Sequence, residues 1–75
     1  PAKLSYNEKR ELEALPGRIE ALEKEVADIE ALLADGSAYQ SDPVRYKAAS
    51  ERLEPARTEL EAAVERWAEL EERNS

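Results

Sequence analysis

Residues 12–33, LEALPGRIEALEKEVADIEALL, decide the fold, because apolar side chains recur along them at steps of three and four residues. This spacing places the apolar side chains on one stripe of a helix, which packs lengthwise against a partner helix in a coiled coil. The first stripe consists of Leu12, Leu15, Ile19, Leu22, Val26, Ile29 and Leu33. The stretch therefore predicts a partner helix elsewhere in the chain.

The second half of the chain has the same spacing and can supply that partner. Its stripe consists of Tyr46, Ala49, Leu53, Ala56, Leu60, Ala63, Trp67 and Leu70. With turn-forming residues between the stripes, the sequence predicts an all-α fold, a single antiparallel two-helix coiled-coil hairpin over residues 1–75. We expect an N-terminal arm at 1–5, a first helical arm at 6–34, a turn at 35–42 and a second helix at 43–73.

The first helical arm has a clear start signal and one interruption. Ser5 followed by Glu8 predicts a capping box, with Ser5 as the N-cap and Leu4 packing onto the first turn. Pro16 cannot donate a backbone hydrogen bond, and it disfavours helical geometry at Leu15. The sequence therefore predicts a kink or a short break at Leu15-Pro16.

The turn and the second helix have similar signals. Gly36 predicts a left-handed residue after the first helix, and Asp42 with Pro43 predicts the N-cap and first residue of the second. Tyr39, which has no seam position, is expected to fold back over the end of the core. Pro55 predicts a bend of the second helix near residues 51–55.

The charged residues that flank the stripes select a register. If Leu15 meets Leu60, every flanking pair is attractive, whereas sliding one helix by a heptad, so that Leu15 meets Trp67, brings like charges together. In the first register, Trp67 and Leu70 extend beyond Leu12, toward Leu4 and the N-terminal arm. The predicted ion pairs are Glu11 with Arg66, Arg18 with Glu59, Glu25 with Arg52, and Glu23 with Arg57.

The composition argues against an enzyme. A chain of 75 residues without His or Cys lacks the commonest general base, zinc ligand and thiolate nucleophile, and it is too short to enclose both a core and a substrate pocket. Glu71 and Glu72 are adjacent on a helix and point apart, which favours a solvated face over a catalytic pair or a calcium site. We predict no catalysis, no metal, no membrane span and a cytoplasmic location.

Two groups of basic residues stand out against the net charge of −7. They predict a phosphate-contacting patch at one or both ends of the hairpin, and their alternative role is solubility and ion pairing. Trp67 has two interpretations as well, a base-stacking platform or a core residue, and its seam position favours the core. The candidate nucleic-acid-binding residues are Lys3, Lys9, Arg10, Arg45, Lys47 and Arg52.

Two segments carry a resemblance to a known family. Residues 3–16, KLSYNEKRELEALP, and 65–71, ERWAELE, resemble the opening and closing stretches of the C-terminal domain of Uup-type ABC-F ATPases. The resemblance implies a hairpin appended to tandem ATP-binding cassettes in a longer soluble protein, associated with the ribosome, translation and DNA. ATP and Mg²⁺ belong to those cassettes, and no Gly-rich phosphate loop with Lys occurs here, so we expect no cofactor in this segment.

Two functions are therefore open. The first is a non-catalytic arm that contacts DNA or ribosomal RNA through its basic patches. The alternative is a structural or protein-interaction coiled coil, which docks on its own ATP-binding domains or self-associates through Leu32 and Val64 beside the seam. We expect the isolated domain to be a monomer, with a weak dimer as the alternative.

Overall fold

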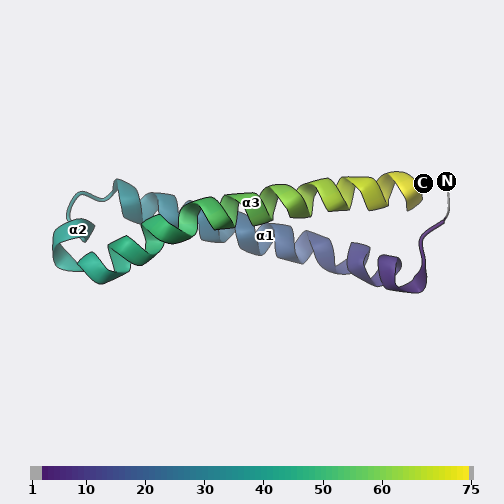
Figure 1. Ribbon diagram of the computed structural model, residues 1–75, viewed down its shortest axis with the longest axis horizontal. Helices are drawn as coiled ribbons and strands as arrows, with labels where there is room; N and C mark the ends of the chain where they lie inside the picture. Colours follow the sequence, from purple (N-terminus) through teal and green to yellow (C-terminus); the bar gives the residue numbers. More distant parts are fainter. Residues whose placement is uncertain (1–2, 75) are drawn as a thin grey trace.

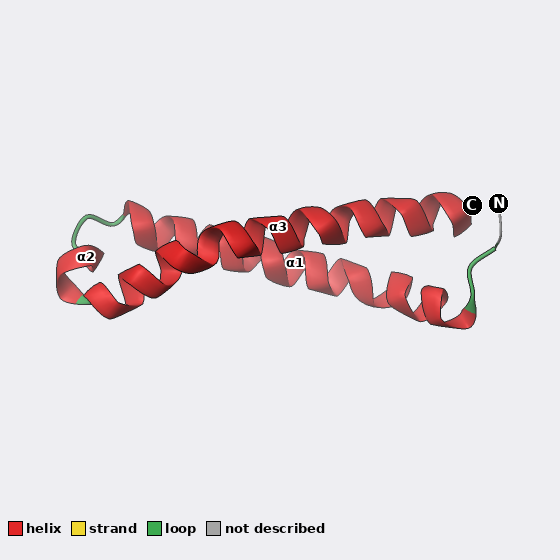
Figure 2. Ribbon diagram, in the orientation of Figure 1, coloured by secondary structure: helices red, strands yellow, loops and turns green. Residues whose placement is uncertain are grey.

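The chain folds into one long helical hairpin, seen in a computed structural model that describes residues 3–74 (Figure 1). Helix α1 spans Tyr6–Ala34, the single-turn helix α2 spans Ala38–Ser41, and helix α3 spans Pro43–Asn74. Helices α1 and α3 run antiparallel, and α2 lies at the turn. The described residues contain no strand (Figure 2), and the rod measures 54 × 15 × 14 Å. The predicted all-α hairpin is confirmed.

The predicted start of α1 is confirmed in detail. The Glu8 N–H donates to Ser5 Oγ at 3.2 Å, and the Ser5 N–H donates to Glu8 Oε1 at 3.0 Å, which completes the capping box. Leu4, just before the cap, is buried and belongs to the same core cluster as Leu15 and Leu70. Leu4 therefore anchors the start of α1 to the hairpin, while residues 1–2 of the predicted N-terminal arm lie outside the described residues.

Both long helices continue through their prolines. Helix α1 is uninterrupted at Pro16, so the prediction of a break there is wrong, while a kink stays a prediction. Both Pro16 and Pro55 are exposed, and the seam on either side holds each helix in register. Helix α3 follows a curved path in Figure 1, in agreement with a bend in this helix.

The end of α1 differs from the prediction for Gly36. No described residue has a positive φ, so a left-handed Gly36 is wrong. Instead Asp35 is extended, with φ −84° and ψ 105°, and its Oδ1 accepts hydrogen bonds from the Ser37 N–H at 3.0 Å and the Ser37 hydroxyl at 2.8 Å. A side chain rather than a glycine conformation therefore closes this turn.

The rest of the predicted turn at 35–42 is partly helical, because α2 occupies four of its residues. Asp42 caps α3 as predicted, since its Oδ1 accepts a hydrogen bond from the Arg45 N–H at 3.1 Å. Tyr39 does not cover the core: its side chain is 63% exposed and meets the Tyr46 ring edge-on at 5.2 Å between centroids. Ala38 is the buried residue of α2.

The core is a narrow seam in which bulky residues of α1 pack against alanines and leucines of α3. Leu15, Leu22 and Ile29 are buried on α1, and Ala56, Ala63 and Leu70 are buried on α3. Leu70 is the one large side chain among residues 3–74 that is fully buried. The partly buried Leu12, Ile19 and Leu60 pack against this cluster.

Three of the four predicted ion pairs form across the seam. Their shortest distances are 2.7 Å for Glu11 with Arg66, 3.2 Å for Arg18 with Glu59, and 2.7 Å for Glu25 with Arg52.

The fourth prediction is wrong, because Arg57 pairs with Glu30 at 2.7 Å, one heptad beyond Glu23. Trp67 is also misplaced by the prediction: it lies beside Pro16 and Ile19 instead of projecting past the first stripe. Both differences fit the register that is slid by one heptad. Long arginine side chains reach along their helix, so three of the pairs form in either register, and ion-pair counting alone does not fix the offset.

Candidate nucleic-acid interface

The ion pairs divide the eleven basic residues into two groups. Six of them form ion pairs with carboxylates: Arg18, Lys24, Arg52, Arg57, Arg66 and Arg73. The other five form none within residues 3–74 and are exposed: Lys3, Lys9, Arg10, Arg45 and Lys47. These five lie toward the two ends of the rod, so the middle has no cation left for a phosphate.

The turn end carries Arg45 and Lys47 near the start of α3. Residues 31–50 contain these two basic residues and two acidic ones, Asp35 and Asp42, so the turn end is neutral and the net charge of −7 lies elsewhere. The Ser37 hydroxyl and N–H bind the Asp35 carboxylate and hold its pKa below the usual value. Both acidic side chains at this end are therefore occupied by backbone capping.

Exposed aromatic and apolar groups accompany these cations. Val44 is 80% exposed next to Arg45, and Tyr39 presents its ring on α2. From the sequence, we expected Tyr39 to fold back over the end of the core.

The opposite end of the rod carries Lys3, Lys9 and Arg10. The Arg10 guanidinium lies 5.9 Å from the centroid of the Tyr6 ring and donates to the Tyr6 hydroxyl at 3.4 Å. Lys3 and Lys9 line a hollow together with Arg73. The structure thus separates the six predicted binding residues into two distant clusters, with Arg52 between them.

Arg52 is held by two carboxylates of the hairpin. It donates to both Glu25 oxygens, at 2.7 and 2.9 Å, and to Glu59 Oε2 at 2.7 Å. The hydrogen bonds that Arg52 donates to Glu25, and then those to Glu59, raise the Arg52 pKa, and Arg52 in turn lowers the pKa of both carboxyl groups. We therefore leave Arg52 out of the proposed interface.

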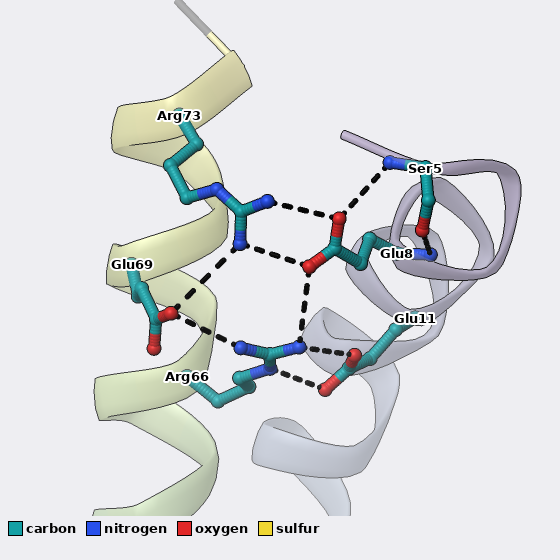
Figure 3. A network of polar contacts seen from close by, with 6 residues as sticks. All are labelled: Ser5, Glu8, Glu11, Arg66, Glu69 and Arg73. Carbon is teal, nitrogen blue, oxygen red and sulfur yellow. Dashed lines mark hydrogen bonds and ion pairs between the residues drawn. The ribbon is translucent and has the colours of Figure 1, made fainter. Parts of the chain in front are cut away.

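A network of six residues closes the end of the rod where α1 begins and α3 finishes (Figure 3). Arg73 donates to both oxygens of Glu8, at 2.8 and 2.9 Å, while Arg66 bridges Glu11 at 2.7 Å and Glu69 at 3.2 Å. The hydrogen bonds that Glu8 accepts, first those from Arg73 and then the one from the Ser5 N–H, lower the Glu8 pKa to about 2. Glu8 therefore both caps α1 and ties it to α3.

The contact between Glu8 and Arg73 was missed from the sequence. Glu8 falls on the spacing of the first stripe, one heptad before Leu15, and that position is the signal that it faces α3.

Trp67 lies beside Pro16 and Ile19 on the side of the hairpin, and no residue of either basic cluster lines the same groove. Its side chain is 38% exposed, so it is neither a fully buried core residue nor a free platform. Glu20 and Glu23 line the same groove, and their charge repels a phosphate backbone. The geometry does not favour stacking of a nucleic-acid base at this position.

Within residues 3–74, no group of three or more His, Cys, Asp or Glu side chains is arranged to hold a metal ion. None of the helices in that range combines the length and apolar composition that a membrane span requires.

Comparison with known proteins gives one match that covers nearly the whole chain. The family model described as ABC transporter C-terminal domain matches residues 3–72. No curated protein and no solved structure matches the chain significantly.

Proposed function

Because the chain belongs to the ABC transporter C-terminal domain family, we propose that it is the non-catalytic arm of a cytoplasmic ABC-F ATPase. The arm contacts nucleic acid, DNA or ribosomal RNA, through the turn end of the hairpin. One observation carries this choice of end: Arg45 and Lys47 are exposed and form no ion pair within residues 3–74, while the two acidic residues of the turn end, Asp35 and Asp42, are engaged in capping hydrogen bonds.

The position of the turn end supports the same assignment. The start of α1 and the end of α3 lie together, and the turn lies at the other end of a 54 Å rod (Figure 1). Such an arm carries its tip to a site remote from any domain joined at its termini. The ordered ion pairs along the rod keep the tip at a fixed distance.

Binding through Arg45 and Lys47 is electrostatic and reads no base sequence. Lysine and arginine contacts to phosphates position a protein on nucleic acid without sequence information. Two such contacts give a slope of about −2 in log affinity against log salt concentration on duplex DNA. The net charge of −7 weakens the encounter, so we expect binding only at low salt.

The test is fluorescence anisotropy with a labelled DNA duplex and, separately, a labelled RNA hairpin. The double variant Arg45→Glu/Lys47→Glu should abolish binding at low salt, because it replaces both cations at the turn with anions. The matched control is Lys9→Glu/Arg10→Glu, which makes the same charge change at the other end and should retain most binding. Loss in the control alone, or no binding by the wild-type chain, would contradict the proposal.

The second candidate function is a protein-interaction module that self-associates beside the seam. The observation in its favour is the exposure of apolar side chains there: Val64 is 42% exposed, while Leu32 is half-buried. Sedimentation at several concentrations tests it, since a dimer in the micromolar range would favour this function and a monomer throughout would count against it.

A further inference from the structure

A groove opens on the edge of the seam around Trp67. Pro16, which lines the groove, and Arg18 lie on opposite sides of the apolar stripe of α1. The groove is therefore on the opposite edge of the seam from the ion pair between Arg18 and Glu59. The groove encloses about 540 Å³. We call it the Trp67 groove. Its lining residues are Pro16, Ile19, Glu20, Glu23, Val64 and Trp67.

The floor of the Trp67 groove is apolar and its rim is acidic. Trp67, Val64 and Ile19 contribute large apolar side chains that are only partly covered. Glu20 and Glu23 form no ion pair within residues 3–74, and no basic residue lines the groove. The rim therefore presents uncompensated negative charge next to an exposed tryptophan, the residue type most enriched in binding hot spots.

This charge pattern discriminates among occupants. Nucleic acid is repelled by the rim. A second copy, paired by a two-fold axis, would present the same surface and set Glu20 and Glu23 against their own counterparts. A peptide with basic residues beside an apolar face satisfies both the floor and the rim.

We infer that the Trp67 groove is a docking site for an amphipathic helix of a protein partner, with large apolar residues on one face and Lys or Arg at its flanks. An amphipathic helix lays its apolar face into such a groove through residues spaced by three and four positions. The apolar side chains cover Trp67, and the basic flanks pair with Glu20 and Glu23. This docking does not depend on nucleic-acid contact at the turn.

Trp67 makes the test direct, because it is the one tryptophan in the chain. The probe is a synthetic amphipathic helix built from Leu and Lys, and the measurement is the Trp67 emission during titration. We expect a saturable blue shift as the ring loses water. A peptide with Glu in place of Lys should give no shift, and a scrambled Leu/Lys peptide without an apolar face should give none either.

Variants of the groove separate docking from general attraction to an acidic protein. Val64→Glu and Glu20→Lys/Glu23→Lys should each weaken the peptide by about tenfold or more, as expected for the loss of a central contact. Val44→Glu is the matched control, because it places the same change on an exposed valine at the turn, and it should leave affinity unchanged. Circular dichroism checks that each variant keeps its helical content.

The docking site would be overturned if the Leu/Lys peptide gave no saturable shift, if Val44→Glu and Val64→Glu weakened binding equally, or if the scrambled peptide bound equally well. Dimerisation of the wild-type chain that Val64→Glu abolishes would also overturn it, since the groove would then hold a second copy. Failure of nucleic-acid binding at Arg45 and Lys47 leaves these outcomes unchanged.

Discussion

The two edges of the seam differ in whether ion pairs between α1 and α3 close them. On one edge, arginine and glutamate pairs bridge α1 and α3 along much of the rod, through Glu11, Arg18 and Glu25. A hollow over Leu15 and Ala63 remains there, but an ion pair closes it at either end. On the other edge, the Trp67 groove has acidic residues alone as its charged rim. One buried stripe therefore supports a closed edge and an open one.

The difference follows from the residues that flank the stripes at steps of seven. On the closed edge, Glu11, Arg18 and Glu25 alternate in sign, and α3 supplies the opposite charge to each.

On the open edge, α1 supplies Lys9, Pro16, Glu23 and Glu30 at steps of seven, whereas α3 supplies a single basic residue, Arg57, which pairs with Glu30. Glu23 forms no ion pair within residues 3–74. The charge pattern thus predicts which edge stays open, even though the buried stripe holds both helices together.

The largest effect is expected from the buried seam shared by both edges. Leu70→Ala removes a fully buried side chain and should lower the free energy of unfolding by about 2–5 kcal/mol. Val64→Ala, on the open edge, should change it by about 0.5 kcal/mol, because its site is partly solvated. Urea unfolding followed by circular dichroism measures both. Similar losses in the two variants would show that the open edge is part of the core.

The sequence predicted the hairpin well because the two stripes and the caps act locally. Ser5 and Asp42 cap the helices where the sequence indicated, since capping depends on residues within one turn. The offset of α3 along α1 was harder, because a slide by one heptad keeps every apolar residue in the seam. The placement of Trp67 and the partner of Arg57 depend on that offset, and both were predicted wrongly.

The candidate interface was predictable to a smaller extent. Arg45 and Lys47 were identified by type, but whether a given arginine is paired depends on partners that are distant in the sequence. Arg52 had one predicted partner, Glu25, and the structure adds Glu59 from its own helix. The exposure of Tyr39 was not predicted, because the extra turn of α2 gave no distinct signal.

An intermediate effect is expected where the closed edge meets the start of α1. The Glu8 pKa is lowered to about 2 in the folded state, from 4.5, chiefly by Arg73. A lowered pKa means that ionised Glu8 stabilises the fold above about pH 4.5, and that this contribution is lost as the pH falls toward 2. Glu8→Gln should therefore unfold at a lower urea concentration than the wild-type chain at pH 7, with the difference disappearing near pH 2.

The control for Glu8 is Glu61→Gln, which removes an exposed carboxylate of α3 that forms no ion pair within residues 3–74. Its effect at pH 7 should be smaller than that of Glu8→Gln. A difference between Glu8→Gln and wild type that keeps its full size at pH 2 would mean that the glutamine disturbs packing, and the electrostatic explanation would then fail.

The smallest effect on stability is expected when single glutamates of α1 are replaced, one on each edge of the seam. Glu25→Gln removes the partner of Arg52 on the closed edge and should lower the urea midpoint modestly. Glu23→Gln makes the same change on the open edge, where no cation is lost. Its free energy of unfolding should stay within about 0.5 kcal/mol of wild type. The shift should be toward higher stability, because Glu23 and Glu20 repel each other at i,i+3.

A double-mutant cycle with Arg52→Gln gives the decisive measurement. Arg52→Gln should couple to Glu25→Gln and should be additive with Glu23→Gln, because Arg52 contacts only the first of these carboxylates. Equal coupling to both positions would mean that the arginine acts through the general field of the acidic rod. The distinction between a closed and an open edge would then have no energetic basis, and the uncompensated rim of the Trp67 groove would lose its significance.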